Sequence, residues 1–191
     1  MVGQASLSGS GTVHTLFDFT KTDHVNNWTE YSDTVRSTGM SKAALVIQKS
    51  QIIQRAILFT LFVPKMSGSG FAGIRTETNF DLREYHYIAI KCRGQGVNFK
   101  YKMVLRHKGL GKDSAVYGQV FTVIESEFSV LKLSLDDFKP YFRGLPVSPE
   151  ANPLDTSAIT NIGIKIDNGP YLPENQSGVS VLEIDWIKAL K

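Results

Sequence analysis

The chain has 191 residues, of which 42% are hydrophobic and 20% charged, and its formal net charge is +3. This length suits one large domain and scarcely two, and the composition is that of an ordinary globular protein. The small net charge gives no global argument for binding to nucleic acid or a membrane surface, and no apolar run reaches the ~18–20 residues that span a bilayer. Cys92 is the only cysteine, which excludes an intrachain disulfide and a cysteine-based zinc site.

Residues 1–11 are small, polar and rich in glycine, which predicts a disordered tail or an expression remnant before a single domain over residues 12–191. They contain neither the apolar segment of a signal peptide nor the arginines of a transit peptide. The compartment stays open, because the single cysteine fits a reducing environment whereas two sequons fit a secreted protein. The sequons are Asn27-Trp-Thr29 and Asn175-Gln-Ser177.

Alternating apolar and polar residues predict β-strands along most of the chain. The expected strands cover residues 12–19, 85–91, 97–106, 116–124, 128–135, 162–166 and 179–187. In the clearest of them, the apolar face carries Val97, Phe99, Tyr101, Met103 and Leu105. Gly94-Gln-Gly96 is expected to form the turn before it. A period of two with one apolar face is typical of half-buried antiparallel strands, so we predict an all-β, mostly antiparallel sandwich.

The segment from Ser41 to Val63 is apolar and free of Gly and Pro, so a helix capped by Ser41 is an alternative there. Its Val, Ile and Phe residues favour strands, and we expect two strands joined by a turn at Lys49-Ser-Gln51. Asp136 to Lys139 is expected to form one helical turn before Pro140.

Gly68-Ser-Gly-Phe-Ala-Gly73 matches the G-x-G-x-x-G pattern of dinucleotide sites, which need a helix directly after the glycines. Residues 74–78 alternate instead and favour a strand. We therefore expect no bound cofactor and a glycine-rich corner, with Gly68 and Gly70 in the turn. Gly73 is expected to be a small residue or a bulge within the next strand, beside Phe71 in the core.

Other candidate motifs fail on their spacing. Arg106 to Lys112 resembles a phosphate loop, but Arg106 and Asp113 stand where glycine and Ser or Thr are required. The four histidines are dispersed, so no metal site is expected, although loop carboxylates leave calcium open. No sequence pattern marks a catalytic carboxylate pair or a nucleophile elbow, so we expect no enzyme.

Basic residues recur on the polar faces of two consecutive predicted strands. Lys91 lies on one of them, Lys100, Lys102 and Arg106 lie on the other, and Lys108 and Lys112 follow. We favour a solvated face that discourages edge pairing; a surface for an acidic partner or anionic ligand is the alternative. Nucleic acid is not expected, because Phe99 and Tyr101 point to the opposite face.

A series of short motifs, in order, resembles the CIA30 family, the complex I intermediate-associated protein 30 domain. The motifs are Leu16-Phe-Asp-Phe19, Trp28, Ser32-Asp33 through Gly39-Met-Ser41, Gly70 to Thr76, Asp81-Leu82, Tyr85, Gly94-Gln-Gly96 with residues 97–105, Tyr117, Phe121, Phe138, Phe142-Arg-Gly144, Ile162-Gly-Ile164 and Leu182-Glu-Ile184. They span about residues 15–188. Departures are Phe128 in place of a Trp, Leu135-Asp136 in place of a Pro, and Thr38-Gly39 in place of Gly-Gly.

The resemblance implies a galactose-binding-domain-like jelly roll and a non-enzymatic protein that works like an assembly factor or chaperone on respiratory complex I subunits, in mitochondria. A carbohydrate- or small-ligand-binding module, secreted, is the alternative. The candidate binding residues are Trp28, Asp33, Arg75 and Arg143, together with the basic residues Lys100, Lys102 and Arg106. For Trp28 a place in the core is the favoured interpretation, Asp33 could serve only its turn, and a structural ion pair competes with binding for Arg75 and Arg143.

Overall fold

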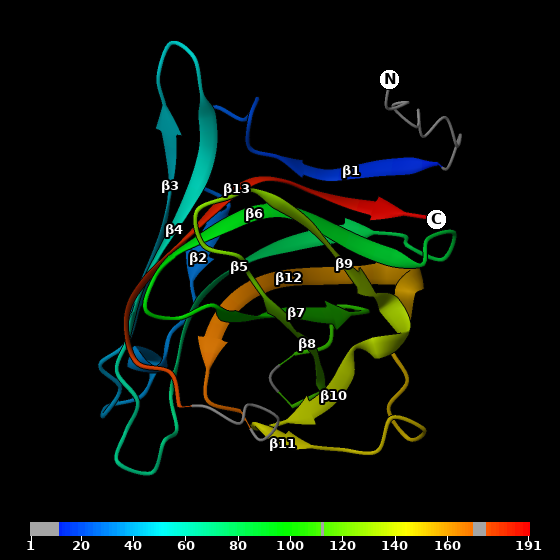
Figure 1. Cartoon of the computed structure of the whole chain (residues 1–191). Coiled ribbons are helices and arrows are strands. Elements are labelled where there is room, and N and C mark those ends of the chain that lie inside the picture. Colours follow the sequence, from blue (N-terminus) through cyan, green and yellow to red (C-terminus); the bar gives the residue numbers. More distant parts are fainter. Residues whose placement is uncertain (1–11, 112, 170–174) are drawn as a thin grey trace, which may run out of the picture.

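Two antiparallel sheets pack face to face in the computed structural model, which describes residues 12–111, 113–169 and 175–191 (Figure 1). Sheet A holds β3 (Lys42–Lys49), β4 (Gln54–Phe62), β13 (Gly178–Leu190), β6 (Tyr87–Gly96) and β9 (Ser129–Ser134) in that order, and β1 (Val13–Asp18) also pairs with β13. Sheet B holds β11 (Leu145–Pro146), β10 (Lys139–Phe142), β8 (Val116–Thr122), β7 (Lys100–His107), β12 (Ile159–Asp167), β5 (Phe71–Phe80) and β2 (Trp28–Glu30). The prediction of an all-β sandwich is confirmed.

Within the described residues, three short 3-10 helices connect the strands: η1 (Asp33–Val35), η2 (Leu135–Asp137) and η3 (Thr156–Ala158). The second of them is the helical turn expected before Pro140. None of the helices in the described part of the chain is long and apolar enough to cross a bilayer.

The core lies between the sheets and is built by the period-two pattern of the strands. Tyr101, Met103 and Leu105 of β7 are fully buried, as are the isoleucines at 162, 164 and 166 of β12. β-branched and aromatic side chains suit such a half-buried pleated surface. The residues between them therefore face away from the core, and on sheet B they form the surface on which several predicted binding residues lie.

The segment 41–63 forms the β3–β4 hairpin, as predicted, and the helix alternative is wrong. The Ser50 hydroxyl accepts hydrogen bonds from the backbone N–H groups of Ile52 and Ile53, at 3.3 and 3.1 Å, and so shapes the turn. Figure 1 shows this hairpin projecting beyond the rest of the sandwich.

The predicted turn at Gly94 to Gly96 is wrong, because β6 continues through these residues and pairs with β13 there. The chain then crosses from sheet A to sheet B before β7 begins. Val97 lies in this crossing and is 67% exposed, so its predicted place on the apolar face is also wrong. Since β6 and β7 belong to different sheets, Lys91 does not share a face with the basic residues of β7.

The glycine-rich corner at residues 68–73 leads into a strand, as expected, since β5 begins at Phe71. Gly68 and Gly70 adopt positive φ angles of 77° and 147°, which favour glycine. Gly73 pairs in regular register with Lys165, and a Cβ atom there would lie 2.4 Å from the Cβ of Lys165. Phe71 is half-buried on the outside of sheet B, which corrects its predicted place in the core.

Candidate binding face

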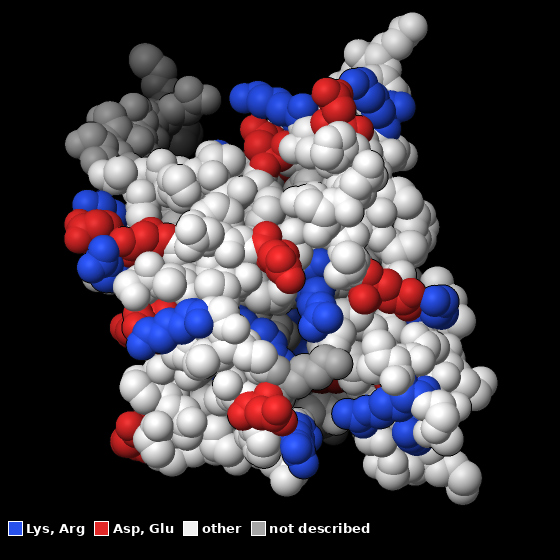
Figure 2. Space-filling view, turned by 180° about the vertical axis from the view of Figure 1, so that it is seen from behind, with Lys and Arg blue, Asp and Glu red and all other residues white. Residues whose placement is uncertain are grey.

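The outer face of sheet B gathers basic side chains from three adjacent strands. We call it the basic face: its charged residues are Arg75 and Glu77 of β5, Lys165 and Asp167 of β12, and Lys100, Lys102 and Arg106 of β7. The strand register places Lys165 beside Lys102 and Asn161 beside Arg106. Seen from behind, lysine and arginine side chains lie in a hollow in the middle of the molecule (Figure 2).

Two aromatic rings at one side of the basic face are covered by cations. Tyr31 follows β2 and donates its backbone N–H to the carbonyl of Gly73 at 2.8 Å. The Arg75 guanidinium lies 4.5 Å from the centre of the Tyr31 ring, and the Phe71 ring lies 4.9 Å from the same ring. The Lys165 ammonium in turn lies 5.3 Å from the Phe71 ring. These cation–π contacts hold the charged groups flat against the sheet.

Arg106 lies diagonally across β12 from Arg75, because Arg75 pairs with Gly163 and Arg106 pairs with Asn161, two residues earlier. Burial lowers the pKa of Arg106; the Tyr31 hydroxyl opposes this shift, and the like charge of Arg75 adds to it. One guanidinium nitrogen of Arg106 donates to the carbonyl of Gly111 at 2.7 Å. Glu77 lies across Asn161 from Arg106, but neither arginine has a carboxylate within ion-pair distance among the described residues.

Lys102, Lys165 and Asp167 form a buried ion cluster next to the arginines. The Lys102 ammonium lies 2.8 and 3.0 Å from the two Asp167 oxygens, and the Lys165 ammonium lies 2.6 Å from one of them. Burial lowers the pKa of Lys102, against the pull of Asp167. Burial alone would raise the pKa of Asp167, but the two ammonium groups bring it below its usual value. One carboxylate thus serves two ammonium groups, and the cluster keeps a net positive charge.

Two glycines lie within the strands of the basic face and are buried there. Gly163 pairs with Arg75 on one side and with Val104 on the other, and Val104 pairs with Gly118. A Cβ atom on Gly163 would lie 2.9 Å from the carbonyl oxygen of Ile74. Gly163 is itself buried, so its missing side chain allows β12 to pack closely against β5 beside Arg75.

The structure brings Arg75, Lys100, Lys102 and Arg106 together on the basic face and places the other predicted site residues elsewhere. Trp28 lies in the core, 9% exposed, with its ring 5.0 Å from that of Phe17. Arg143 is exposed in the β10–β11 turn and lies 3.7 Å from Asp113. Lys108 pairs with Asp155 at 2.6 Å, and Lys112 falls outside the described residues.

Asp33 is 1% exposed and ties three segments together from η1. Its carboxylate accepts hydrogen bonds from the Ser41 N–H at 2.9 Å, the Ser41 hydroxyl at 3.0 Å and the Phe71 N–H at 3.4 Å. Both carboxylate oxygens therefore hold the turn before β3 and the start of β5, and they do not point to a ligand site.

Sequence reasoning missed Tyr31, Phe71, Lys165 and Asp167 as members of the basic face. A signal existed for two of them: the alternation of isoleucines at 162, 164 and 166 already places Lys165 and Asp167 on the opposite, polar side. No local pattern marks Tyr31, which reaches the face through the pairing of β2 with β5.

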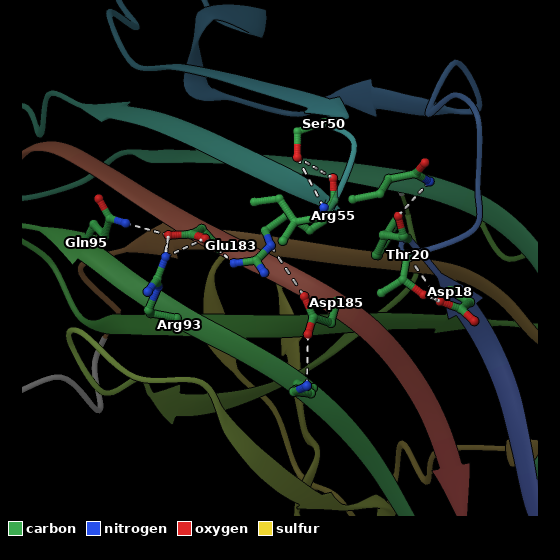
Figure 3. A network of polar contacts seen from close by, with 12 residues as sticks. Asp18, Thr20, Ser50, Arg55, Arg93, Gln95, Glu183 and Asp185 are labelled. Carbon is green, nitrogen blue, oxygen red and sulfur yellow. Dashed lines mark hydrogen bonds and ion pairs between the residues drawn. The ribbon is translucent and has the colours of Figure 1, made fainter. Parts of the chain in front are cut away.

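A second polar cluster occupies the outer face of sheet A (Figure 3). Glu183 is 4% exposed and accepts hydrogen bonds from Arg55 at 2.7 Å, from Arg93 at 2.6 Å and from Gln95. Asp185 lies 3.0 Å from the Lys91 ammonium. Each carboxylate of the cluster forms ion pairs with cations of the same cluster. The cluster therefore differs from the basic face, where the two arginines have no such ion pair.

The potential metal ligands among the described residues are dispersed. No set of three or more His, Cys, Asp and Glu side chains gathers among them in a way that could hold a metal ion. A cavity of about 490 Å³ opens beside His107 and Tyr117. His107 Nδ1 accepts the Asp155 N–H at 2.7 Å and the Tyr117 hydroxyl donates to the carbonyl of Pro153 at 3.2 Å, so both side chains are held by the backbone.

Comparisons with known proteins agree with this architecture. Residues 17–184 match the family model described as complex I intermediate-associated protein 30 (CIA30). The fold is similar to a family 11 carbohydrate-binding module from Clostridium thermocellum in complex with a β-1,3-1,4-mixed-linked tetrasaccharide, with TM-score 0.68, 19% identity and coverage of 95% of this chain and 96% of that chain. It is also similar to a family 30 carbohydrate-binding module, with TM-score 0.61, 13% identity and coverage of 94% and 99%. No curated protein sequence matches. The predicted jelly-roll sandwich is thereby confirmed.

Proposed function

Because the chain belongs to the complex I intermediate-associated protein 30 family, we propose that it is a non-enzymatic binding protein, an assembly factor or chaperone that holds a protein partner. The partner would be a subunit or intermediate of respiratory complex I, and the place of action the mitochondrion. The observation that carries the proposal is the family match over residues 17–184, which takes in strands of both sheets. The basic face is the surface that we assign to the partner.

The electrostatics of the carboxyl groups support a role without catalysis. A glycosidase-type general acid needs a carboxyl group whose pKa is raised. Among the described residues, each carboxyl group with a shifted pKa is shifted downward: Asp18, Glu30, Asp81, Glu150, Asp155, Asp167 and Glu183. These groups are held as carboxylates and are poor proton donors at neutral pH.

A carbohydrate-binding module, secreted, is the second candidate, and the likeness to two carbohydrate-binding modules supports it. Open aromatic side chains commonly anchor ligands, because they offer a large apolar surface. On the basic face, however, the Tyr31 ring is covered by Arg75 and the Phe71 ring by Lys165. This arrangement leaves less ring surface for a neutral sugar and favours the first candidate.

The proposal is tested by affinity capture from mitochondria of the source organism after mild cross-linking. The tagged chain is expected to retain subunits of complex I from incompletely assembled complexes. The family 11 module, which shares the fold, is the matched control and should retain none of them. Equal capture by both proteins, or measurable binding of the mixed-linked tetrasaccharide without capture of any complex I subunit, would overturn the proposal.

A further inference from the structure

We propose that Arg75 and Arg106 form an anion site that binds the carboxylate side chains of an acidic, extended segment of the partner protein. This inference rests on the proposed function, since it names the chemistry by which the basic face would recognise that partner. It goes further, because it assigns the recognition to two arginines and to negatively charged side chains of the partner.

The first argument is the balance of charge on the face. Lys102 and Lys165 share Asp167, whereas Arg75 and Arg106 lie close enough to repel one another and pair with no carboxylate among the described residues. Holding two guanidinium groups together costs free energy that an arriving anion would recover. Arginine is also the side chain best suited to a carboxylate, because its planar fork donates two parallel hydrogen bonds.

The second argument is that the two arginines are held in place before a ligand arrives. Tyr31 holds Arg75, since the Arg75 guanidinium lies 4.5 Å from the centre of its ring. Arg106 is fixed by its hydrogen bond to Gly111. Side chains held in this way lose less conformational entropy on binding than free surface arginines.

The third argument is the shape of the floor. Gly163 lies beside Arg75, and Asn161, two residues earlier on the same strand, pairs with Arg106. Gly163 therefore adds no side chain between the arginines, whereas the Lys102 and Tyr141 side chains cover the position of Gly118, one strand beyond Val104. An extended polypeptide can lie close to such a surface and place alternate side chains toward the arginines.

A polypeptide suits these features better than a neutral or an acidic sugar does. A pyranose ring gains much of its affinity by stacking on aromatic faces, and here cations cover the rings of Tyr31 and Phe71. A flexible acidic segment needs only the guanidinium groups. The surrounding Lys100, Lys102 and Lys165 would add long-range attraction for a chain with several carboxylates.

The test uses an acetylated hexaglutamate peptide titrated into the full chain by calorimetry at low salt. Arg75→Gln and Arg106→Gln should each weaken binding about tenfold or more, as expected for losing a charge-assisted hydrogen-bonded contact. The control is Arg83→Gln, which removes an exposed arginine that pairs with Asp81 at 2.5 Å and should change affinity by less than about twofold. Added salt should weaken the wild-type interaction.

Thermal unfolding checks that each variant is folded, and Arg75→Lys, which keeps the charge without the fork, should show an intermediate loss. Wild-type affinity in both glutamine variants would overturn the inference. Tighter binding of hexagalacturonate than of hexaglutamate would also overturn it, in favour of an acidic sugar. If complex I subunits are still captured by the glutamine variants at wild-type levels, the anion site fails and the proposed function stands. If hexaglutamate binding depends on the arginines but wild-type captures no subunit, the proposed function fails instead.

Discussion

Replacing Glu183 with glutamine should destabilise the sandwich far more than a surface ion pair would. Glu183 is 4% exposed, and its oxygens accept from Arg55, Arg93 and Gln95 (Figure 3). Removing one partner of a buried ion pair typically costs about 3–5 kcal/mol. The Arg55 and Arg93 side chains keep 15% and 28% of their exposure, so solvent screens part of the unpaired charge. We therefore expect a loss of about 2–3 kcal/mol in the free energy of unfolding.

Urea unfolding at pH 7 measures this loss, provided the slope against denaturant is unchanged. Glu84→Gln is the matched control, because Glu84 is 79% exposed and lies 3.4 Å from the Lys191 ammonium. This control should cost less than about 0.5 kcal/mol. A Glu183→Gln loss as small as that of the control would refute the reasoning, since it would mean that the network contributes no more than an exposed pair.

Three further predictions concern stability and reactivity. The pKa values of Asp167 and Glu183 are lowered in the folded chain, so the stability that these two carboxylates contribute is present above their unfolded-state pKa and is lost on acidification. The free energy of unfolding should therefore be level near neutrality and fall from about pH 5 toward pH 2. A level profile down to about pH 3 would contradict this. Gly73→Ala should cost more than about 2 kcal/mol in urea unfolding, because its Cβ would lie 2.4 Å from that of Lys165, and a neutral effect would show that the strands can separate. Burial raises the pKa of the Cys92 thiol to about 12, so the native protein should resist Ellman's reagent and react only when unfolded; rapid native reaction would rule out this burial.

The sequence predicts those parts of the fold that depend on local alternation. Tyr101, Met103 and Leu105 are buried as their period of two requires, and the hairpin at residues 41–63 follows from its β-branched residues. Alternation does not say which sheet a strand joins. Gly94 and Gly96 look like a turn, but the chain continues in β6 because their missing side chains permit close approach: a Cβ on Gly96 would lie 2.7 Å from the carbonyl of Val179.

The candidate face was predictable in part for the same reason. Lys100, Lys102 and Arg106 share one side of a single strand, which alternation alone can show. Their association with Arg75 requires β12 to lie between β5 and β7, and that order arises from pairings between residues more than 50 positions apart in the chain. Hydrophobicity predicts Phe71 in the core, yet its ring lies on the basic face and contacts Lys165 and Tyr31.

The position of the partner on the sandwich is the central claim, and hydrogen exchange of the complex tests it most directly. When a complex I subunit retained by affinity capture is bound, backbone amides of β5, β7 and β12 around Arg75, Gly163 and Arg106 should exchange more slowly, whereas those on the outer side of sheet A should not change. Protection confined to sheet A around Glu183, with none on sheet B, would contradict the account.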